Sequence, residues 1–312
     1  MAQNGLVFIL FMSKTIILAG GTGLIGTRLT ALLEEKGHRV RILTRTPRRE
    51  GQYQWDPYAG TIDTAVFEGA DAIINLAGSG IADRRWTNAR KKDLIDSRVK
   101  SIETLRNALK TLPERPSVFV TASAVGIYGD SGETLQTEAT PVAPPPRSFM
   151  VECCDQWEKA ADTMAEIGLR TVKIRIGVVL TKEGGALKEI ARPVSLGVGA
   201  YFDDGQAWTP WIHLDDICRV FLWAVENNQM EGVYNGVSPH PVRNYDLTKA
   251  TVKAMDKWAL LVPAPAFALR LVLGEMAAVV LNSNLVSAEK LTKTGFQFQF
   301  PDVEGALLQI WQ

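Results

Sequence analysis

The chain of 312 residues is 46% hydrophobic and 22% charged, a composition typical of a globular protein with a large buried core. Its 34 basic and 34 acidic residues cancel, so it lacks the basic surface of nucleic-acid-binding proteins, and we expect no nucleic-acid partner. The three cysteines, Cys153, Cys154 and Cys218, are an odd number without metal-ligand spacing, which argues against disulfides or a metal site and predicts reduced thiols in the cytoplasm.

Two apolar runs raise the question of a membrane. Residues 5–12, GLVFILFM, have no positive flank and no small-residue cleavage site, and they are too short to span a bilayer. We expect residues 1–12 to be an N-terminal extension, with Met12 as the natural start. The second run, Phe267 to Leu281, is interrupted by Arg270 and Glu275 and predicts a core helix. The sequence therefore predicts no membrane partner.

The first motif is a glycine-rich turn between a strand and a helix. Thr15 to Ala19 is a short apolar run, followed by GGTGLIG, a helical pattern (TRLTALLEEKGH) and a second strand, RVRILTR. This order is the unit that binds a dinucleotide: Gly20 allows the tight turn, Gly23 lets the pyrophosphate approach, and Gly26 lets helix and strand pack closely. The helix N-terminus supplies N–H groups for the phosphates. The predicted contacts in this motif are Gly20, Thr22, Gly23, Leu24, Ile25 and Gly26.

The end of the second strand distinguishes NAD from NADP. NAD-binding proteins usually place an acidic residue there to hold the ribose 2′-hydroxyl. Here the strand ends with Thr44 and Arg45, and no carboxylate follows before Glu50. An acid would repel a 2′-phosphate, whereas Arg binds it through two hydrogen bonds and stacks on the adenine. We therefore predict NADP(H), with Arg45 as the main contact and Thr44 or Arg48 assisting.

Three more hydrophobic strands are separated by helical segments. The strands are DAIINLAG (71–78), PSVFVTASAVGIYGD (116–130) and RTVKIRIGVVL (170–180), and helices are expected over 87–110 and 152–167. This alternation predicts an α/β fold with a Rossmann-like doubly wound parallel sheet. Small residues at the end of the first of these strands would let the cofactor lie across the sheet edge. They add Asn75, Leu76, Ala77 and Gly78 to the predicted cofactor contacts.

The chain changes character beyond residue 180. Residues 183–206 mix a helix with a glycine-rich loop, 215–227 predict another helix, and the chain from about 244 is mainly helical. We predict a Rossmann domain over 13–180 and a mixture of substrate loop and returning Rossmann elements over 181–243. A smaller, mainly helical substrate-side domain is expected over 244–312.

Together these segments resemble the short-chain dehydrogenase/reductase superfamily, in its extended, sugar-epimerase-like branch. The match is closer to the atypical subgroup called epimerase family proteins. It is carried by GGTGLIG, NLAG, IADRRWTNARKKDLIDSRV, SAVGIYG, CDQWEKAA, RIGVVL, WIHLDD and LTKTGFQFQFPDVEGAL. The resemblance covers residues 14–312 and implies a Rossmann-like NADP(H) domain with a small C-terminal domain. It implies no particular substrate.

Active members of the superfamily use a Tyr as acid/base, a Lys four residues later, and a Ser or Thr. The resemblance makes Ser123, in TASAVGIYG, the candidate catalytic hydroxyl, although counting back from Tyr128 puts the usual position on Ala124. Hydride transfer needs a proton partner of tuned pKa. Tyr128 lies in the loop after this strand and is the candidate acid.

The usual Tyr–Lys pair is missing from the next helix. In one register the two positions are Phe149 and Cys153, and in the other they are Met150 and Cys154. Neither register supplies a phenol or an amine. One alternative is that a cysteine near the helix N-terminus carries a thiol of lowered pKa. The other is that these residues only form a wall beside the nicotinamide.

Two further groups are candidates for the substrate side. Arg84, Arg85, Lys91 and Arg98 follow the NLAG strand and could bind an anionic group, although each could equally lie on a solvated helix face. His213, in WTPWIHLDD, has Trp and Asp neighbours that predict a folded lid or a domain junction.

Two functions fit these residues. The first is an NADP(H)-dependent oxidoreductase or epimerase acting on an unknown small-molecule substrate, such as a sugar nucleotide or a carbonyl compound. The second is a non-catalytic NADPH-binding redox sensor or scaffold. The absent Tyr–Lys pair weighs against ordinary reductase chemistry, whereas Ser123 and an elaborate substrate side weigh for a reaction, so we favour the enzyme. Surface helices that pair subunits elsewhere in the superfamily leave an oligomer open.

Overall fold

The computed structural model describes residues 13–312, and the predicted N-terminal extension, 1–12, lies outside them. The described residues form an eight-stranded sheet in the order β13-β8-β6-β5-β1-β2-β3-β4. Neighbouring strands are parallel except for β3 and β4. The strands are β1 (Thr15–Ala19), β2 (Arg39–Thr44), β3 (Gln52–Asp56), β4 (Thr61–Ile62), β5 (Ala72–Asn75), β6 (Val118–Ala124), β8 (Arg170–Ile176) and β13 (Gly232–Gly236).

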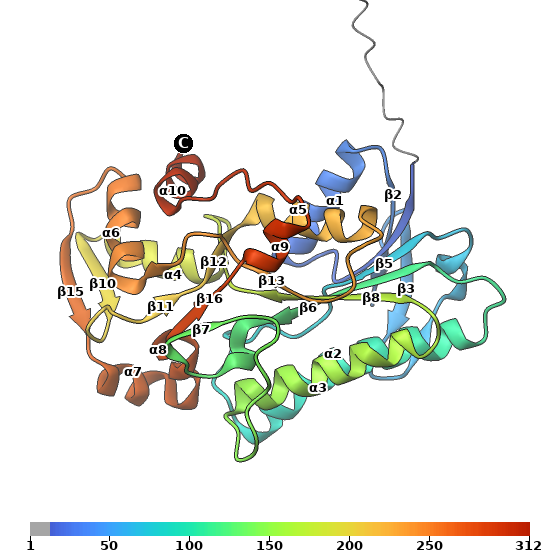
Figure 1. Cartoon of the computed structure of the whole chain (residues 1–312), viewed down its shortest axis with the longest axis horizontal. Coiled ribbons are helices and arrows are strands. Elements are labelled where there is room, and N and C mark those ends of the chain that lie inside the picture. Colours follow the sequence, from blue (N-terminus) through green and yellow to red (C-terminus); the bar gives the residue numbers. More distant parts are fainter. Residues whose placement is uncertain (1–12) are drawn as a thin grey trace, which may run out of the picture.

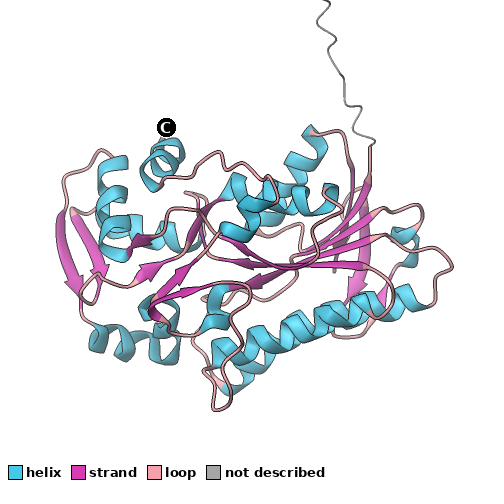
Figure 2. Ribbon diagram, in the orientation of Figure 1, coloured by secondary structure: helices cyan, strands magenta, loops and turns pink. Residues whose placement is uncertain are grey.

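Helices cover both faces of this sheet. Helices α1 (Leu24–Glu35) and α5 (Leu214–Glu226) pack together on one face, and α2 (Asn88–Lys110) and α3 (Phe149–Ala165) pack on the other (Figures 1 and 2). Because both faces are covered, the inner strands are continuous hydrophobic runs rather than alternating ones. Residues 16–19 of β1 and 72–75 of β5 are buried throughout. The predicted doubly wound parallel sheet is confirmed.

The two long helices begin where side chains cap them. The Thr87 hydroxyl accepts a hydrogen bond from the Arg90 N–H at 3.2 Å at the start of α2. Ser148 does the same for Val151 at the start of α3, at 3.5 Å. Such caps satisfy N–H groups that have no partner within the helix. Helix α3 therefore starts at Phe149, before residue 152, which was the predicted start.

The predicted strand over 170–180 is in fact two strands, and the break falls at Gly177. The chain leaves β8 there and forms β9 (Val178–Leu180), which pairs with β12 (Trp211–His213) outside the main sheet. A side chain at Gly177 would place its Cβ only 2.6 Å from the Pro210 carbonyl oxygen. The close approach of another backbone segment therefore sets this break.

A second, smaller hydrophobic core lies beside the sheet, at the left of Figure 1. Helices α4 (Gly185–Val194), α6 (Asn244–Ala254) and α10 (Val303–Trp311) contribute most of its residues. A parallel pair of strands, β10 (Val198–Phe202) and β15 (Leu260–Ala264), lies beside it, with β10 against α4 and α6. Its buried residues are Leu180, Leu187, Ile190, Trp211, Leu247, Ala250, Val303, Ala306, Leu307 and Ile310. The core thus takes residues from both sides of position 244, while the domain limits given above stay predictions.

Short elements complete the fold. They are β7 (Gly132–Gln136), which pairs with β16 (Asn284–Val286), β11 (Trp208–Thr209), which pairs with β14 (Val242–Arg243), helices α7 (Ala266–Leu273), α8 (Ala278–Leu281) and α9 (Glu289–Lys293), and 3-10 turns at Thr64–Phe67, Val125–Tyr128 and Gly274–Ala277.

The expectation of a core helix over 267–281 is wrong. Helix α7 stops after Leu273, because Gly274 adopts a φ of 61°, and none of its residues is buried. Phe267 and Leu271, for example, are 74% and 78% exposed. The sequence of α7 is apolar almost all round, so its pattern could not show which face, if any, meets the protein. Among residues 13–312, no helix combines the length and apolar character needed to cross a bilayer.

Candidate cofactor and active site

The glycine turn lies at the carboxyl end of β1, at the point where the order of strands reverses between β1 and β5. Ligands of open α/β sheets bind at such a point. Gly20 has a φ of +82°, and a Cβ there would lie 2.7 Å from the Leu76 carbonyl carbon. The turn and the NLAG segment are therefore in contact. The structure thus brings together two of the predicted cofactor segments.

The other two glycines of the motif have different surroundings. A Cβ on Gly26 would lie 2.7 Å from the Gly21 Cα and still closer to the Gly20 carbonyl oxygen, so α1 can cross the turn only with glycine there. A Cβ on Gly23 would have a single neighbour, the Gly20 carbonyl oxygen at 3.4 Å. Gly23 and Thr22 are exposed and Leu24 and Ile25 half-buried, so this helix N-terminus is open to an anion.

The end of β2 carries the predicted NADP contacts. Thr44 is half-buried, and Arg45 and Arg48 are exposed. Within residues 13–312 the Arg45 guanidinium forms no hydrogen bond and no ion pair, and the nearest acid along the chain, Glu50, is also exposed. An unpaired guanidinium at this strand end fits a phosphate better than a ribose hydroxyl, since it can donate two hydrogen bonds to one anion.

Asn75, at the end of β5, holds the NLAG segment in place. Its side-chain oxygen accepts from the Ala77 N–H at 3.2 Å, and its amide nitrogen donates to the Ser101 hydroxyl at 3.1 Å. Asn75 is fully buried, whereas Leu76 and Ala77 are half-buried and Gly78 is exposed. Asn75 would therefore support ligand binding by fixing the backbone of the NLAG segment.

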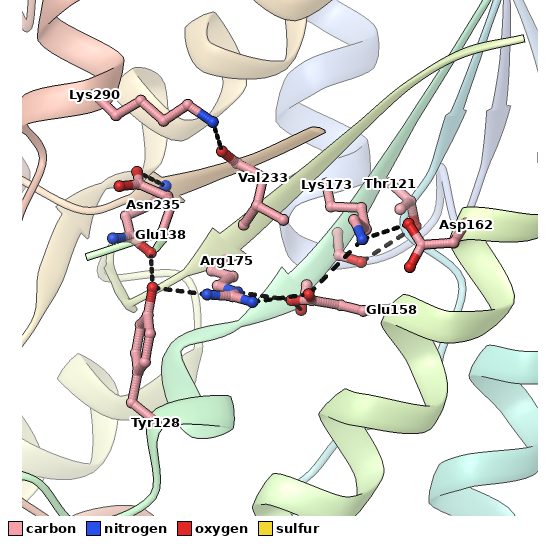
Figure 3. Close-up of polar contacts among 12 residues, drawn as sticks. Thr121, Tyr128, Glu138, Glu158, Asp162, Lys173, Arg175, Val233, Asn235 and Lys290 are labelled. Carbon is pink, nitrogen blue, oxygen red and sulfur yellow. Dashed lines mark hydrogen bonds and ion pairs between the residues drawn. The ribbon is translucent and has the colours of Figure 1, made fainter. Parts of the chain in front are cut away.

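Ser123, on β6, and Tyr128 both belong to a buried network that also includes residues of β8, α3 and β13. Figure 3 shows Tyr128 with Arg175, Glu158 and Asn235 of this network. The Ser123 hydroxyl donates to Glu158 at 2.7 Å. Arg175 donates to both Glu158 oxygens, at 2.8 and 2.9 Å, and to the Tyr128 hydroxyl at 2.9 Å. The Tyr128 hydroxyl in turn donates to the side-chain oxygen of Asn235 at 2.7 Å. The two candidate catalytic residues are therefore linked through a single ion pair.

The network sets the protonation of its members. Burial raises the pKa of the Tyr128 hydroxyl, although the Arg175 charge opposes this shift. Burial alone would lower the pKa of Arg175, but its hydrogen bonds and ion pair with Glu158 outweigh burial and raise it. Both groups therefore hold their protons at neutral pH. Before Ser123 or Tyr128 could donate a hydrogen bond or a proton to a substrate, its hydroxyl would have to release the acceptor that it now contacts, Glu158 or Asn235.

Glu158, Arg175 and Asn235 were not among the predicted site residues. The sequence does contain a signal for Glu158 and Arg175. Lys173 and Arg175 stand two positions apart in a hydrophobic strand, and Glu158 and Asp162 stand four apart on a helix, so each pair lies on one face of its element. Two cations on a strand face and two acids on a helix face can pair when the helix packs on the strand. Lys173 does pair with Asp162, at 2.5 Å.

The positions of the missing Tyr–Lys pair lie in the first two turns of α3. The rings of Phe149 and Trp86 meet edge to face at 4.8 Å. Cys153 and Cys154 are buried, and burial raises the pKa of both thiols. The interpretation of a thiol with lowered pKa is therefore wrong, because burial outweighs any effect of the helix N-terminus. All three cysteines are unpaired.

The four candidate cations lie in three places. Arg84 is exposed, while Arg85 and Lys91 both meet the turn at residues 274–275, where the Arg85 guanidinium lies beside Gly274 and Lys91 pairs with Glu275. Arg98 lies against Gly78 of the NLAG segment. The expectation that these cations bind an anionic group stays a prediction.

His213 connects the start of α5 with α10. Its Nδ1 accepts from the Asp215 N–H at 3.1 Å and so caps α5, while its Nε2 lies 2.9 Å from the side-chain oxygen of Gln309 on α10. The ring also packs on Phe300, with centroids 4.1 Å apart. Burial lowers the pKa of His213, which keeps the ring neutral and its Nδ1 free to accept.

Comparison with known proteins agrees with this fold. A model of the NAD dependent epimerase/dehydratase family matches residues 16–235, and a domain of unknown function, DUF1731, matches 264–310. The chain is 34% identical to epimerase family protein YfhF of Bacillus subtilis over 95% of its own length and 97% of that protein. It is also 34% identical to the chloroplastic SDR39U1 homolog of Arabidopsis thaliana, over 96% and 87% of the two chains.

Solved structures show the same relation. Human epimerase family protein SDR39U1, crystallised with NADPH, superimposes with a TM-score of 0.85 at 31% identity, over 95% of this chain and 99% of that one. UDP-N-acetylglucosamine 4-epimerase from Bacillus cereus shares the fold, with a TM-score of 0.77 at 17% identity over 96% and 98%. This chain belongs to the NAD dependent epimerase/dehydratase family, among the epimerase family proteins related to SDR39U1.

Proposed function

We propose that this protein binds NADP(H) and acts as an oxidoreductase or epimerase on a small carbonyl- or hydroxyl-bearing substrate. The observation that carries the cofactor is the end of β2, where Arg45 is exposed and unpaired within residues 13–312 and no carboxylate stands before Glu50. The open helix N-terminus at Gly23 would take the pyrophosphate. The NADPH in the human relative supports the same cofactor. When bound, NADP(H) would supply hydride exchange at a substrate carbon.

An Arg45→Ala variant should lose its preference for NADPH over NADH. Removing a hydrogen-bonded guanidinium from a phosphate costs about 1.5–3 kcal/mol, or roughly 10- to 150-fold in affinity. Because NADH has no 2′-phosphate and loses only the stacking of Arg45 on its adenine, its dissociation constant should rise much less. Fluorescence titration with both cofactors measures the two constants. Arg45 is exposed, so the thermal midpoint of the variant should match the wild type and serves as the control. Equal loss for both cofactors would contradict the assignment.

We further propose that Tyr128 and Ser123 move the proton at the substrate oxygen, in place of the absent Tyr–Lys pair. Their link through Arg175 and Glu158 supports a common role. The other candidate function, a sensor or scaffold without turnover, is favoured by the same hydrogen bonds, since both hydroxyls already have partners. The unpaired, buried cysteines support a reducing compartment such as the cytoplasm for either function.

Isotope tracing separates the enzyme from the sensor. The wild-type protein is incubated with fractionated metabolites and NADPH deuterated on either face of nicotinamide C4, and products are searched by mass spectrometry. An enzyme should transfer deuterium from one face, and Tyr128→Phe should slow the transfer by about 10²- to 10⁴-fold if Tyr128 supplies the proton. Tight NADPH binding without transfer from either face would favour the sensor. Transfer at the wild-type rate in both Tyr128→Phe and Ser123→Ala would remove these residues from the chemistry.

A further inference from the structure

Arg98 stands out among the charged side chains near the candidate site. It projects from the middle of α2 and is half-buried. Its guanidinium carbon lies 4.9 Å from the centre of the Trp157 ring on α3, and its Nη1 donates to the Leu94 carbonyl at 2.8 Å. Both contacts fix the side chain in one direction.

That direction is toward the NLAG segment. A Cβ on Gly78 would lie 3.2 Å from both the Cγ and the Cζ of Arg98, so the guanidinium packs directly on the backbone of this glycine. The Arg98 charge also acts on the thiols of Cys153 and Cys154, where it opposes the effect of their burial. A cation therefore stands between the end of β5 and the turn of α3 that lacks its Tyr–Lys pair.

Part of this guanidinium is available to a ligand. Its Nε and Nη2 form no hydrogen bond within residues 13–312, and neither is among the fully enclosed unpaired polar atoms of that part of the chain. Half-buried guanidinium donors are normally paired, because leaving a desolvated donor unpaired costs free energy. Two free donors on a side chain that is otherwise held rigid are a ready site for an oxygen acceptor.

The order of the strands says which part of a dinucleotide would reach Arg98. Arg45 follows β2, the glycine turn follows β1, and Gly78 follows β5, and these three strands are neighbours in that order. A dinucleotide with its 2′-phosphate at Arg45 and its pyrophosphate at the glycine turn runs on toward β5. Its nicotinamide half then lies beside Gly78 and the Arg98 guanidinium.

We propose that Arg98 binds the nicotinamide half of NADP(H), donating N–H groups to its ribose or adjacent phosphate oxygens. The inference rests on the proposed cofactor and adds to it a cationic contact from α2. It makes Arg98 the residue that holds the reactive end of the cofactor, while Arg45 holds the adenosine end. Removing the two residues should therefore affect different fragments of the ligand.

The test compares NADPH with adenosine 2′,5′-bisphosphate, which lacks the nicotinamide half, by calorimetric titration of the full chain. Arg98→Ala should weaken NADPH by roughly 10- to 100-fold, the loss of a charged hydrogen bond, and leave the bisphosphate unchanged. Arg98→Met, which keeps the apolar stem against Trp157, should give the same pattern if the alanine variant folds poorly. Lys92→Ala, which removes an exposed cation from the same helix, is the matched control and should bind both ligands as the wild type does.

Each outcome has one meaning. Loss of NADPH affinity alone supports the contact, and partial recovery in Arg98→Lys strengthens it. Unchanged NADPH affinity in both Arg98 variants overturns the proposal. Equal weakening of NADPH and the bisphosphate overturns it too, because Arg98 would then act through the fold. If the wild-type chain binds neither ligand, the proposed cofactor itself is wrong, and that failure is visible before any variant is made.

Discussion

A Glu158→Gln variant is expected to lose about 3–5 kcal/mol of unfolding free energy, because it breaks a buried ion pair and leaves one charge alone. Glu158 is only 7% exposed and accepts from Ser123 and from two nitrogens of Arg175. With an amide in place of the carboxylate, the Arg175 charge would keep its desolvation cost and lose its counter-ion. Urea unfolding at neutral pH, followed by tryptophan fluorescence, measures the difference.

Helix α3 supplies the matched control for this experiment. Glu166, at the end of the same helix, pairs with Arg106 at 2.7 Å, but its side chain is 62% exposed. An exposed pair is worth about 0–1 kcal/mol, so Glu166→Gln should unfold almost as the wild type does. Replacing Glu158 and Arg175 together by Leu and Met should cost less than Glu158→Gln alone. A loss below about 1 kcal/mol for Glu158→Gln would mean that water reaches and screens the pair.

The second large effect is expected at Gly26. Gly26→Ala should destabilise the protein by about 3 kcal/mol or more, because the added methyl meets backbone atoms on two sides. The Gly21 Cα would lie 2.7 Å from it, and neither this atom nor the Gly20 carbonyl can move without opening the turn. The variant should therefore lose NADPH binding together with stability. Thermal unfolding with and without NADPH measures both.

Gly23→Ala separates these two properties. Gly23 has an ordinary extended backbone, with φ −79° and ψ 175°, and its Cβ would meet only the Gly20 oxygen at 3.4 Å. Stability should stay within about 0.5 kcal/mol of the wild type. NADPH affinity should still fall, since the methyl would occupy the space at the helix N-terminus that the phosphates need. A Gly26→Ala protein as stable as wild type would show that α1 can shift away from the turn.

The sequence predicts the nucleotide half of this protein well, because there each local signal has one structural meaning. The run at Thr15–Ala19 is short, apolar and rich in β-branched residues, Arg39–Thr44 follows the glycine at the end of the predicted helix, and both strands are observed where expected. The glycine spacing predicts a close crossing of α1 over the turn, and the contacts of Gly26 confirm it. These features depend on backbone geometry within a short stretch of chain.

The features that the sequence did not predict depend on partners far away along the chain. The break of the sheet at Gly177 comes from the backbone of Pro210. The ion pair of Arg175 needs Glu158 on a helix that packs on the strand from outside. The exposure of α7 could not be anticipated either, because an all-round apolar helix has no polar face to mark the solvent side. In each case the missing information is which surfaces meet.

The second hydrophobic core has a consequence for the order in which the protein folds. Its members come from segments near residues 180–194, 211, 247–250 and 303–310, so closing it requires long loops, whereas β1, α1 and β2 follow one another directly. Contacts between distant segments form slowly because loop closure costs entropy before any contact repays it. The β1-α1-β2 unit is therefore expected to form first, and the second core closes only after α10, the last of its segments, has been made. A nascent chain that lacks α10 would expose other apolar residues of this core to chaperones.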